Sequence, residues 1–309
     1  MKFAARRYLC SLVILLPSLS VCSWAADIAI GSRRELLVDD YLIERLEGRA
    51  ELRLHSPTVR ETAIAHDAPW EGSGSGYHSV FKDGGLYRMY YKAWQLDVSA
   101  QGVKTDSHPL FTCYAESRDG IHWVKPELGI VEFAGSKKNN IVIASGTDGT
   151  LALDAGHPSI FKDENPACAP DARYKGFIRS SKPNGLVPMK SPDGLHWSPM
   201  TTEPVLVKQG AFDSQNLGFW DAEHGVYRAY WRIFTAGTTT EDNWKPGGYR
   251  AIRTATSKDF IHWESGTDVR YVDSPTEHLY TSVVKPYFRA PHLFIGFPPA
   301  TRIVVPPIR

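Results

Sequence analysis

The sequence predicts an all-β protein, a β-propeller of four-stranded antiparallel blades, because two short phrases recur along it. One phrase is a Ser-x-Asp turn that ends in His-Trp, and its copies stand about 70 residues apart, at 117–123, 191–197 and 257–263. The other is an alternating, tyrosine-rich strand ahead of each copy, at 87–91, 174–177 and 227–231. Repeats of this length indicate that similar supersecondary units build the chain.

Each unit is expected to begin with one more strand and turn, at 80–83, 160–163 and 218–221. In the repeated phrase the Asp side chain can cap a turn, Gly accepts a positive φ, and Trp anchors the next strand in the core. The order is therefore strand, turn, strand, connection, strand, Asp turn and Trp. That order fits a four-stranded blade, and blades around an axis leave only short sheet edges open.

A fourth unit begins at 277–284 and continues through 294–297, but no fourth copy of the Asp-turn phrase follows. The prolines beyond it disfavour interior strands, so the last blade is expected to be truncated. A strand predicted over 35–43 could complete a late blade and close the ring. The alternative is a ring that stays open, with a blade edge prone to aggregation.

The N-terminus is predicted to be a signal peptide of residues 1–25, because a basic start precedes an apolar stretch and a small-residue cleavage site at Ser23–Ala25. The mature chain, 26–309, is expected to be a single β-propeller domain that is secreted or periplasmic. A lipoprotein anchor at Cys22 is the alternative. Cys113 and Cys168 remain in the mature chain, either as a disulfide or as two free thiols.

The charge balance excludes some partners. The 35 Lys and Arg residues against 34 Asp and Glu give a formal net charge of +1. This gives no electrostatic reason to expect nucleic acid or, after signal cleavage, a membrane. We expect no cofactor and no metal, because the sequence has neither a glycine-rich phosphate loop followed by a helix nor a cysteine-rich cluster. The 9 Trp and 14 Tyr suit both blade packing and stacking on sugars.

The Ser-x-Asp-Gly-x-x-Trp turn with its preceding Tyr-Arg-x-Tyr strand resembles the five-bladed β-propeller glycosidase superfamily, which includes fructan-, arabinan- and xylan-cleaving enzymes. Three stretches, 67–78, 210–216 and 277–281, are similar to secreted, uncharacterised glycosidase-like propeller proteins of planctomycete-type bacteria. The resemblance covers roughly residues 33 to 297. It implies five blades, a carbohydrate substrate, and a site built from residues just before the first strand of each blade.

Glycoside cleavage needs one protonated carboxyl and a second carboxylate as base or nucleophile. By resemblance, Glu277 is the expected general acid, and Asp213 is expected to bind sugar hydroxyls or tune the acid. Glu71 is the candidate base or nucleophile. The polar and aromatic residues beside them are expected to contact substrate: Tyr77, His78, His157, Gln215, Asn216, His278 and Tyr280.

The resemblance is incomplete at one position, because Gly76 stands where the family carries its first-blade aspartate. Two functions therefore remain open. The first is a glycoside hydrolase, and the alternative is a carbohydrate-binding or scaffold propeller without catalysis. For Asp213 a local Asx turn is the competing interpretation, for Glu277 a solvated loop position, and for His78 and His157 capping or packing. The sugar, the linkage, the presence of an ion on the propeller axis and the oligomeric state are not fixed by the sequence.

Overall fold

The computed structural model describes residues 28–207, 210–272 and 274–301, and within them the protein is all-β, as predicted. The helical element of these residues is one short 3-10 turn, η1 (Pro170–Ala172). The chain divides into two compact units between Arg53 and Leu54. The single domain of residues 26–309 stays a prediction. The predicted signal peptide lies outside the described residues.

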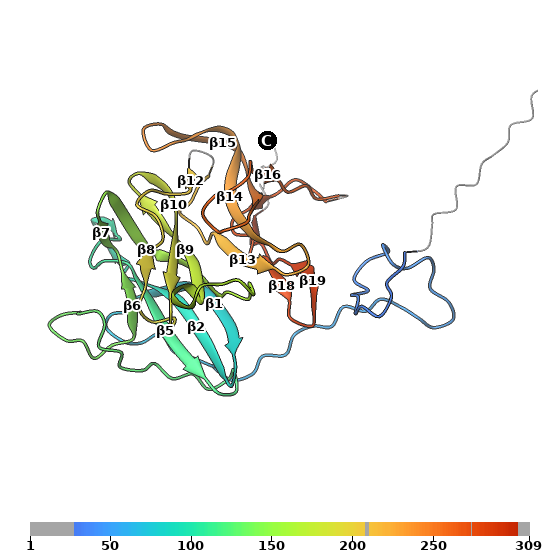
Figure 1. Ribbon diagram of the computed structural model, residues 1–309, viewed down its shortest axis with the longest axis horizontal. Helices are drawn as coiled ribbons and strands as arrows, with labels where there is room; N and C mark the ends of the chain where they lie inside the picture. The colour runs from blue at the N-terminus through green and yellow to red at the C-terminus, as the bar shows by residue number, and fades with distance from the viewer. Residues whose placement is uncertain (1–27, 208–209, 273, 302–309) are drawn as a thin grey trace, which may run out of the picture. The chain divides into compact units, whose positions relative to one another are not determined.

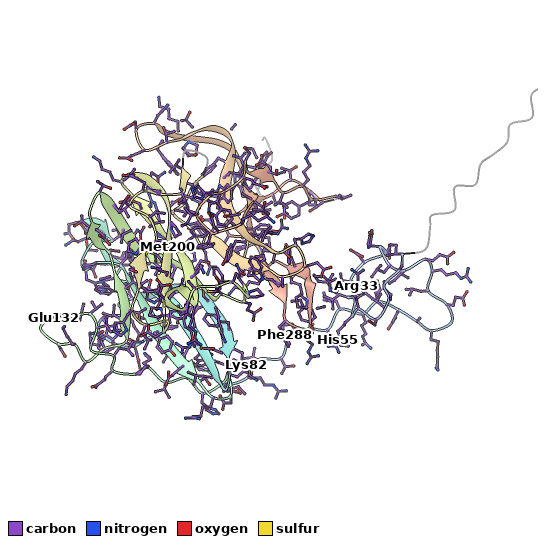
Figure 2. All side chains as sticks on the ribbon, in the orientation of Figure 1. Arg33, His55, Lys82, Glu132, Met200 and Phe288 are labelled. Atoms are coloured by element: carbon purple, nitrogen blue, oxygen red, sulfur yellow. The ribbon has the colours of Figure 1, made fainter. Side chains whose placement is uncertain are left out.

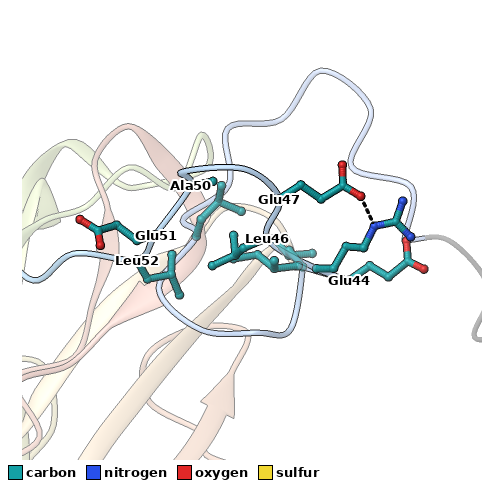
Figure 3. Close-up of a pocket in the computed structure, with 10 residues that line it drawn as sticks. Glu44, Leu46, Glu47, Ala50, Glu51 and Leu52 are labelled. Carbon is teal, nitrogen blue, oxygen red and sulfur yellow. Dashed lines mark hydrogen bonds and ion pairs between the residues drawn. The ribbon is translucent and has the colours of Figure 1, made fainter.

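Residues 28–53 contain no strand, so the strand predicted over 35–43 was wrong. An Asx turn interrupts it, because the Asp39 carboxylate accepts a hydrogen bond of 3.0 Å from the backbone N–H of Tyr41. Beyond this turn the chain coils around an open cavity of about 620 Å³. Figure 3 shows its lining, in which Arg45 and Glu47 form an exposed ion pair of 2.6 Å.

Three antiparallel sheets form the body of the second unit, and their strands follow one another in chain order (Figure 1). Sheet 1 consists of β1 (Gly74–Asp83), β2 (Leu86–Trp94), β5 (Phe111–Ser117) and β6 (Ile141–Ala144). Sheet 2 consists of β7 (Gly146–Asp148), β8 (Leu151–Lys162), β9 (Tyr174–Ser181), β10 (Asn184–Ser191), β11 (Ser198–Pro199) and β12 (Leu206–Val207). Sheet 3 consists of β13 (Leu217–Asp221), β14 (Val226–Thr239), β15 (Trp244–Ser257) and β16 (Thr267–Asp268).

The remaining strands pair only in twos. They are β3 (Asp97–Ser99) with β4 (Gly102–Lys104), β17 (His278–Leu279) with β20 (Ala300–Thr301), and β18 (Lys285–Tyr287) with β19 (Ala290–Ile295). The tip of the β18–β19 hairpin exposes the ring of Phe288 (Figure 2). The first strands β1, β8 and β13 contact one another in that order, as the inner strands of a propeller do. Closure into five blades stays a prediction.

The apolar core lies between successive sheets. Tyr90 of sheet 1 packs in one cluster with Ile160 and Ile178 of sheet 2. Phe177 of sheet 2 packs in another with Phe219 of sheet 3. Each sheet therefore buries its apolar face against the next sheet, which no single sheet could do alone. Cys113 and Cys168 are free thiols, so the packing is not reinforced by a disulfide between them.

The three copies of the repeated phrase fold into the same turn. In the second copy the Asp193 carboxylate accepts hydrogen bonds from the backbone N–H groups of Leu195 and His196, at 2.8 and 2.9 Å. Its other oxygen contacts the His196 ring at 2.8 Å, and the Trp197 indole donates to the Gly194 carbonyl at 3.0 Å. The same bonds recur around Asp119 and Asp259. These aspartates are therefore turn residues, as their sequence pattern indicates.

The third copy carries Phe260 where the other two carry glycine, and Phe260 adopts the left-handed φ of +69°. Its ring is fully buried and stacks on Phe177 at a centroid distance of 4.6 Å. A left-handed conformation costs a non-glycine residue about 1–2 kcal/mol, and burial of the ring offsets this cost.

We expect Phe260→Ala to destabilise the protein by about 3–5 kcal/mol, through loss of the buried ring. Phe260→Gly should be at least as stable as Phe260→Ala, because glycine accepts the positive φ. Phe177 is the matched control, since it is equally buried within strand β9; there the Gly variant should be less stable than the Ala variant by about 0.5–1 kcal/mol. Urea unfolding of the four variants measures both differences. The same Ala-over-Gly order at both positions would contradict the backbone explanation.

A repeated contact, here called the sheet clasp, joins each sheet to the next. At the end of β1, Asp83 binds Arg88 of its own sheet at 2.8 Å and accepts a hydrogen bond of 2.6 Å from the Tyr174 hydroxyl of sheet 2. Asp163, directly after β8, likewise binds Lys175 and accepts a bond of 2.6 Å from the Tyr227 hydroxyl of sheet 3. Each cation also lies over the ring of the tyrosine that crosses the boundary.

The clasp predicts a loss of stability in acid. Burial alone would raise the pKa of Asp83, but hydrogen bonds from Lys162 and Tyr174 outweigh it and lower this pKa to about 2. A folded-state pKa below the unfolded value stabilises the fold above about pH 4, and this contribution is lost as the pH falls through about 2. The stability advantage of the parent over Asp83→Asn should therefore shrink by about 2 kcal/mol between about pH 5 and pH 2. Urea titrations at both pH values test this, and an unchanged difference would contradict it.

Candidate functional site

The candidate site is centred on a β-bulge in β1. The pairing of β1 with β2 shifts register between Gly76 and Ser79, so Tyr77 and His78 lie in the bulge. Tyr77 has a φ of +53°, which is unusual for a residue with a side chain. Bulges re-aim side chains and strained residues gather at functional sites, and both features mark this position.

Tyr77 connects four parts of the second unit. Its hydroxyl lies 3.1 Å from the Tyr280 hydroxyl, which follows β17, and its carbonyl accepts a hydrogen bond of 3.0 Å from the Gln215 side chain, which precedes β13. Its ring lies 5.3 Å from the ring of His157 in β8. Burial, followed by the Tyr280 hydroxyl, raises the pKa of Tyr77, so the phenol stays neutral at physiological pH. The structure thus brings together four of the predicted substrate-binding residues.

An ion pair with one buried partner adjoins these residues. Arg232 of β14, whose side chain is 3% exposed, binds the Asp213 carboxylate and lies over the Tyr280 ring at 5.0 Å. The Asp213 side chain remains 45% exposed. Asp213 therefore keeps one face toward solvent while Arg232 holds the other. We call Tyr77, His157, Asp213, Gln215, Arg232 and Tyr280 the Tyr77 cluster.

Asp154 and Lys92 border the cluster. The Asp154 carboxylate contacts the His157 ring at 2.9 Å and Arg179 at 3.7 Å. Burial would raise the pKa of Asp154, but the bond and charge of His157, the Gly156 N–H and the Arg179 charge together outweigh it, and the pKa is lowered. The Lys92 ammonium lies over the rings of Tyr77 and Trp94, at 5.5 and 4.5 Å. Burial lowers the pKa of Lys92.

Asn216, another predicted contact residue, is buried and shapes the loop before β13. Its side-chain amide donates to the carbonyls of Phe212 and Ser214, at 2.9 and 2.7 Å. These bonds fix the turn that carries Asp213 and Gln215. The structure therefore gives Asn216 a positioning role next to the cluster.

Glu71 is fully buried in a network of its own. It accepts hydrogen bonds from the Tyr91 hydroxyl at 2.6 Å, the Lys125 ammonium at 2.7 Å and the backbone N–H of Ala68 at 2.8 Å. Burial would raise its pKa, but these bonds and one from His66 lower it to about 2. A carboxylate without an exposed face and so firmly ionised suits a structural role better than that of base or nucleophile.

His78 lies beside this network. Its Nε2 atom is 3.1 Å from Nε2 of His66, and its ring stacks on Tyr91 at 5.7 Å. Desolvation, followed by the neighbouring His66, lowers the pKa of His78. The imidazole is therefore neutral at physiological pH.

Glu277 and His278 lie at a different place from the Tyr77 cluster. Glu277 lines a cavity of about 370 Å³ together with Tyr249, Arg250 and Tyr271, and no member of the cluster is among the lining residues described. The His278 ring accepts a hydrogen bond of 3.1 Å from the backbone N–H of Arg250. The side chains of Glu277 and Tyr280 therefore have different neighbours, although only three positions separate the two residues.

The cluster places aromatic rings beside a carboxylate, a guanidinium and an amide, which are groups that can stack on a ligand and hydrogen-bond to it. Within the described ranges, no group of three or more His, Cys, Asp or Glu side chains could hold a metal ion. A search of the same residues finds no helix long and apolar enough to span a membrane.

We expect the two tyrosine hydroxyls to be energetically coupled. A double-mutant cycle of Tyr77→Phe and Tyr280→Phe should give a coupling free energy of about 0.5–1.5 kcal/mol, the usual net contribution of one hydrogen bond. The pair Tyr87→Phe and Tyr280→Phe is the control and should be additive. Chemical denaturation measures all variants, and additivity of the first pair would show that the hydroxyls do not interact.

No family model matches the chain. An uncharacterised protein of Mycobacterium tuberculosis, present in two strains, is 28% identical over 151 residues. This match covers 46% of the chain and 40% of the relative, so the chain spans less than half the length of the curated proteins it matches.

The solved structures to which the chain is similar include glycoside hydrolases. A family 117 glycoside hydrolase of the marine bacterium Zobellia galactanivorans is 12% identical, with a TM-score of 0.43, over 72% of this chain and 63% of that one. An N-acetylgalactosamine deacetylase from F. plautii, solved with blood group B trisaccharide, is 17% identical, with a TM-score of 0.38. That likeness covers 62% of this chain and 51% of the deacetylase.

Proposed function

We propose that this is a secreted, carbohydrate-active protein that binds saccharide at the Tyr77 cluster. The observation that carries the proposal is the meeting of residues from β1, β8, β14, the loop before β13 and the segment after β17 at one point. A sugar ring has apolar C–H faces and an edge of hydroxyls. The tyrosine rings suit the faces, and the charged and amide groups suit the hydroxyls.

Within this proposal Asp213 binds sugar hydroxyls. Arg232 removes the freedom of the Asp213 carboxylate by holding one side of it, while the other side remains exposed to solvent. A carboxylate fixed in this way loses little conformational entropy when a hydroxyl donates to it. The motif resemblance to propeller glycosidases, in which this aspartate contacts sugar, supports the same role.

Glycoside hydrolysis is the second candidate function, because Asp213 presents a partly exposed carboxylate inside the cluster. Hydrolysis also needs a carboxylic acid that can donate a proton near neutral pH. Glu71 does not suit that task, since its pKa is about 2, and Asp154 is held ionised by His157. Glu277 lines a separate cavity. Saccharide binding is therefore the function that the geometry supports best, with Glu277 retained as the acid to test.

The experiment is a binding and hydrolysis screen of residues 26–309 over a polysaccharide panel. Affinity electrophoresis measures binding and reducing-sugar release measures cleavage. Asp213→Asn should weaken binding about tenfold or more, since hydrogen bonds to charged groups contribute about 1.5–3 kcal/mol. Glu132→Gln, at an exposed carboxylate, is the control and should bind like the parent.

The outcomes separate the two functions. Binding without release of reducing ends supports a binding protein. Release by the parent that is lost in Glu277→Gln, with binding retained, supports a hydrolase with Glu277 as its acid. Asp213→Asn that binds every polysaccharide as tightly as the parent would remove the Tyr77 cluster from the proposal.

A further inference from the structure

Two histidines outside the Tyr77 cluster bring ring nitrogens close together. His66, in the segment before β1, and His78, in the β1 bulge, approach through their Nε2 atoms at 3.1 Å. We propose that His66 and His78 bind one divalent transition-metal ion between these two nitrogens. The site is distinct in kind from saccharide binding and does not depend on it.

The separation of the two nitrogens fits a shared ion. A metal–imidazole bond is about 2.0–2.1 Å long, so two nitrogens on one ion lie about 2.9 Å apart at a right angle and about 3.4 Å apart at the tetrahedral angle. The observed 3.1 Å falls between these limits. The ion would replace the proton that the two rings share, and His78 would then carry its proton on Nδ1.

A contact behind the His66 ring favours the tautomer that leaves its Nε2 lone pair available. Its Nδ1 atom lies 3.4 Å from the fully buried Glu71 carboxylate. An acceptor at that place keeps the ring proton on Nδ1 and leaves the Nε2 lone pair toward His78. A carboxylate behind a ligating histidine is the usual arrangement at metal sites, where it fixes the tautomer and raises the basicity of the ligand.

Tyr91 holds both rings in place. Its ring lies 4.4 Å from His66 and 5.7 Å from His78, and its hydroxyl donates to Glu71 at 2.6 Å. One side chain therefore fixes the two ligands and the carboxylate behind them. Such support removes much of the entropy cost of ordering ligands around an ion.

The ligand set selects the class of ion. Imidazole nitrogens suit zinc, copper and nickel, whereas calcium and magnesium prefer oxygen ligands. Two protein ligands leave the other coordination positions to water or an added ligand, as in open metal sites. Solvent can reach the pair, because His78 is exposed and the His66 side chain is 20% exposed.

The test uses tag-free, chelator-stripped chain 26–309. Calorimetric titration with Zn²⁺ should show one site per chain, and the electron paramagnetic resonance spectrum of the Cu²⁺-loaded chain should show coupling to two nitrogens. His66→Gln and His78→Gln should each weaken binding more than about tenfold, since each removes one of the two ligands. His122→Gln is the matched control, because His122 is also exposed and contacts a carboxylate, and its binding should equal that of the parent.

Circular dichroism and thermal unfolding confirm that each variant is folded, and the copper spectrum of the parent needs no variant. The proposal is overturned if the parent binds no Zn²⁺, if its copper spectrum shows fewer than two nitrogens, or if His66→Gln and His78→Gln bind as tightly as the parent. Saccharide binding is measured separately on metal-free protein, so failure of either proposal leaves the other intact.

Discussion

The sheet clasp is the interaction on which the arrangement of the three sheets depends. Apolar packing alone would let one sheet slide over the next, because dispersion contacts have little directional preference. The clasp adds direction, since a tyrosine hydroxyl of one sheet must meet a carboxylate that a cation of the previous sheet already holds. Fixing the sheets in this way places His157 of β8 and the loop before β13 beside the bulge of β1, where the Tyr77 cluster forms.

Much of this fold could be predicted from the sequence, because its signals are local. The turns around Asp119, Asp193 and Asp259 depend on side chains that bond to their own backbone within three residues. The prediction of a strand over 35–43 was wrong because of another local hydrogen bond. Its apolar pattern suits a strand, but Asp39 bonds to the N–H of Tyr41 and ends the extended run. Local hydrogen bonding outweighed the hydrophobic pattern.

The candidate site was predictable only in part. Tyr77, Asp213, Gln215, His157 and Tyr280 stand near the starts of predicted strands and do meet, although their roles stay predictions. Arg232 and Lys92 lie within tyrosine-rich strands whose pattern indicates packing. The alternation of side chains between the two faces of those strands is the signal that could have placed both residues beside the site. His66 lies in a segment without regular structure, so its approach to His78 depends on tertiary packing that periodicity does not reveal.

The third boundary between sheets lacks one part of the clasp. Asp221 ends β13 and binds Arg228 and His224 of its own sheet, and Arg228 lies over Phe294 at 5.4 Å. Phenylalanine has no hydroxyl, so no crossing hydrogen bond to Asp221 is possible from this ring. Amide hydrogens of β17 to β20 should therefore exchange with solvent before those of sheets 1 to 3. Tyr280 belongs to this region, so under the proposed function a saccharide bound against its ring would also hold the last strands in place, and binding and local order would be linked.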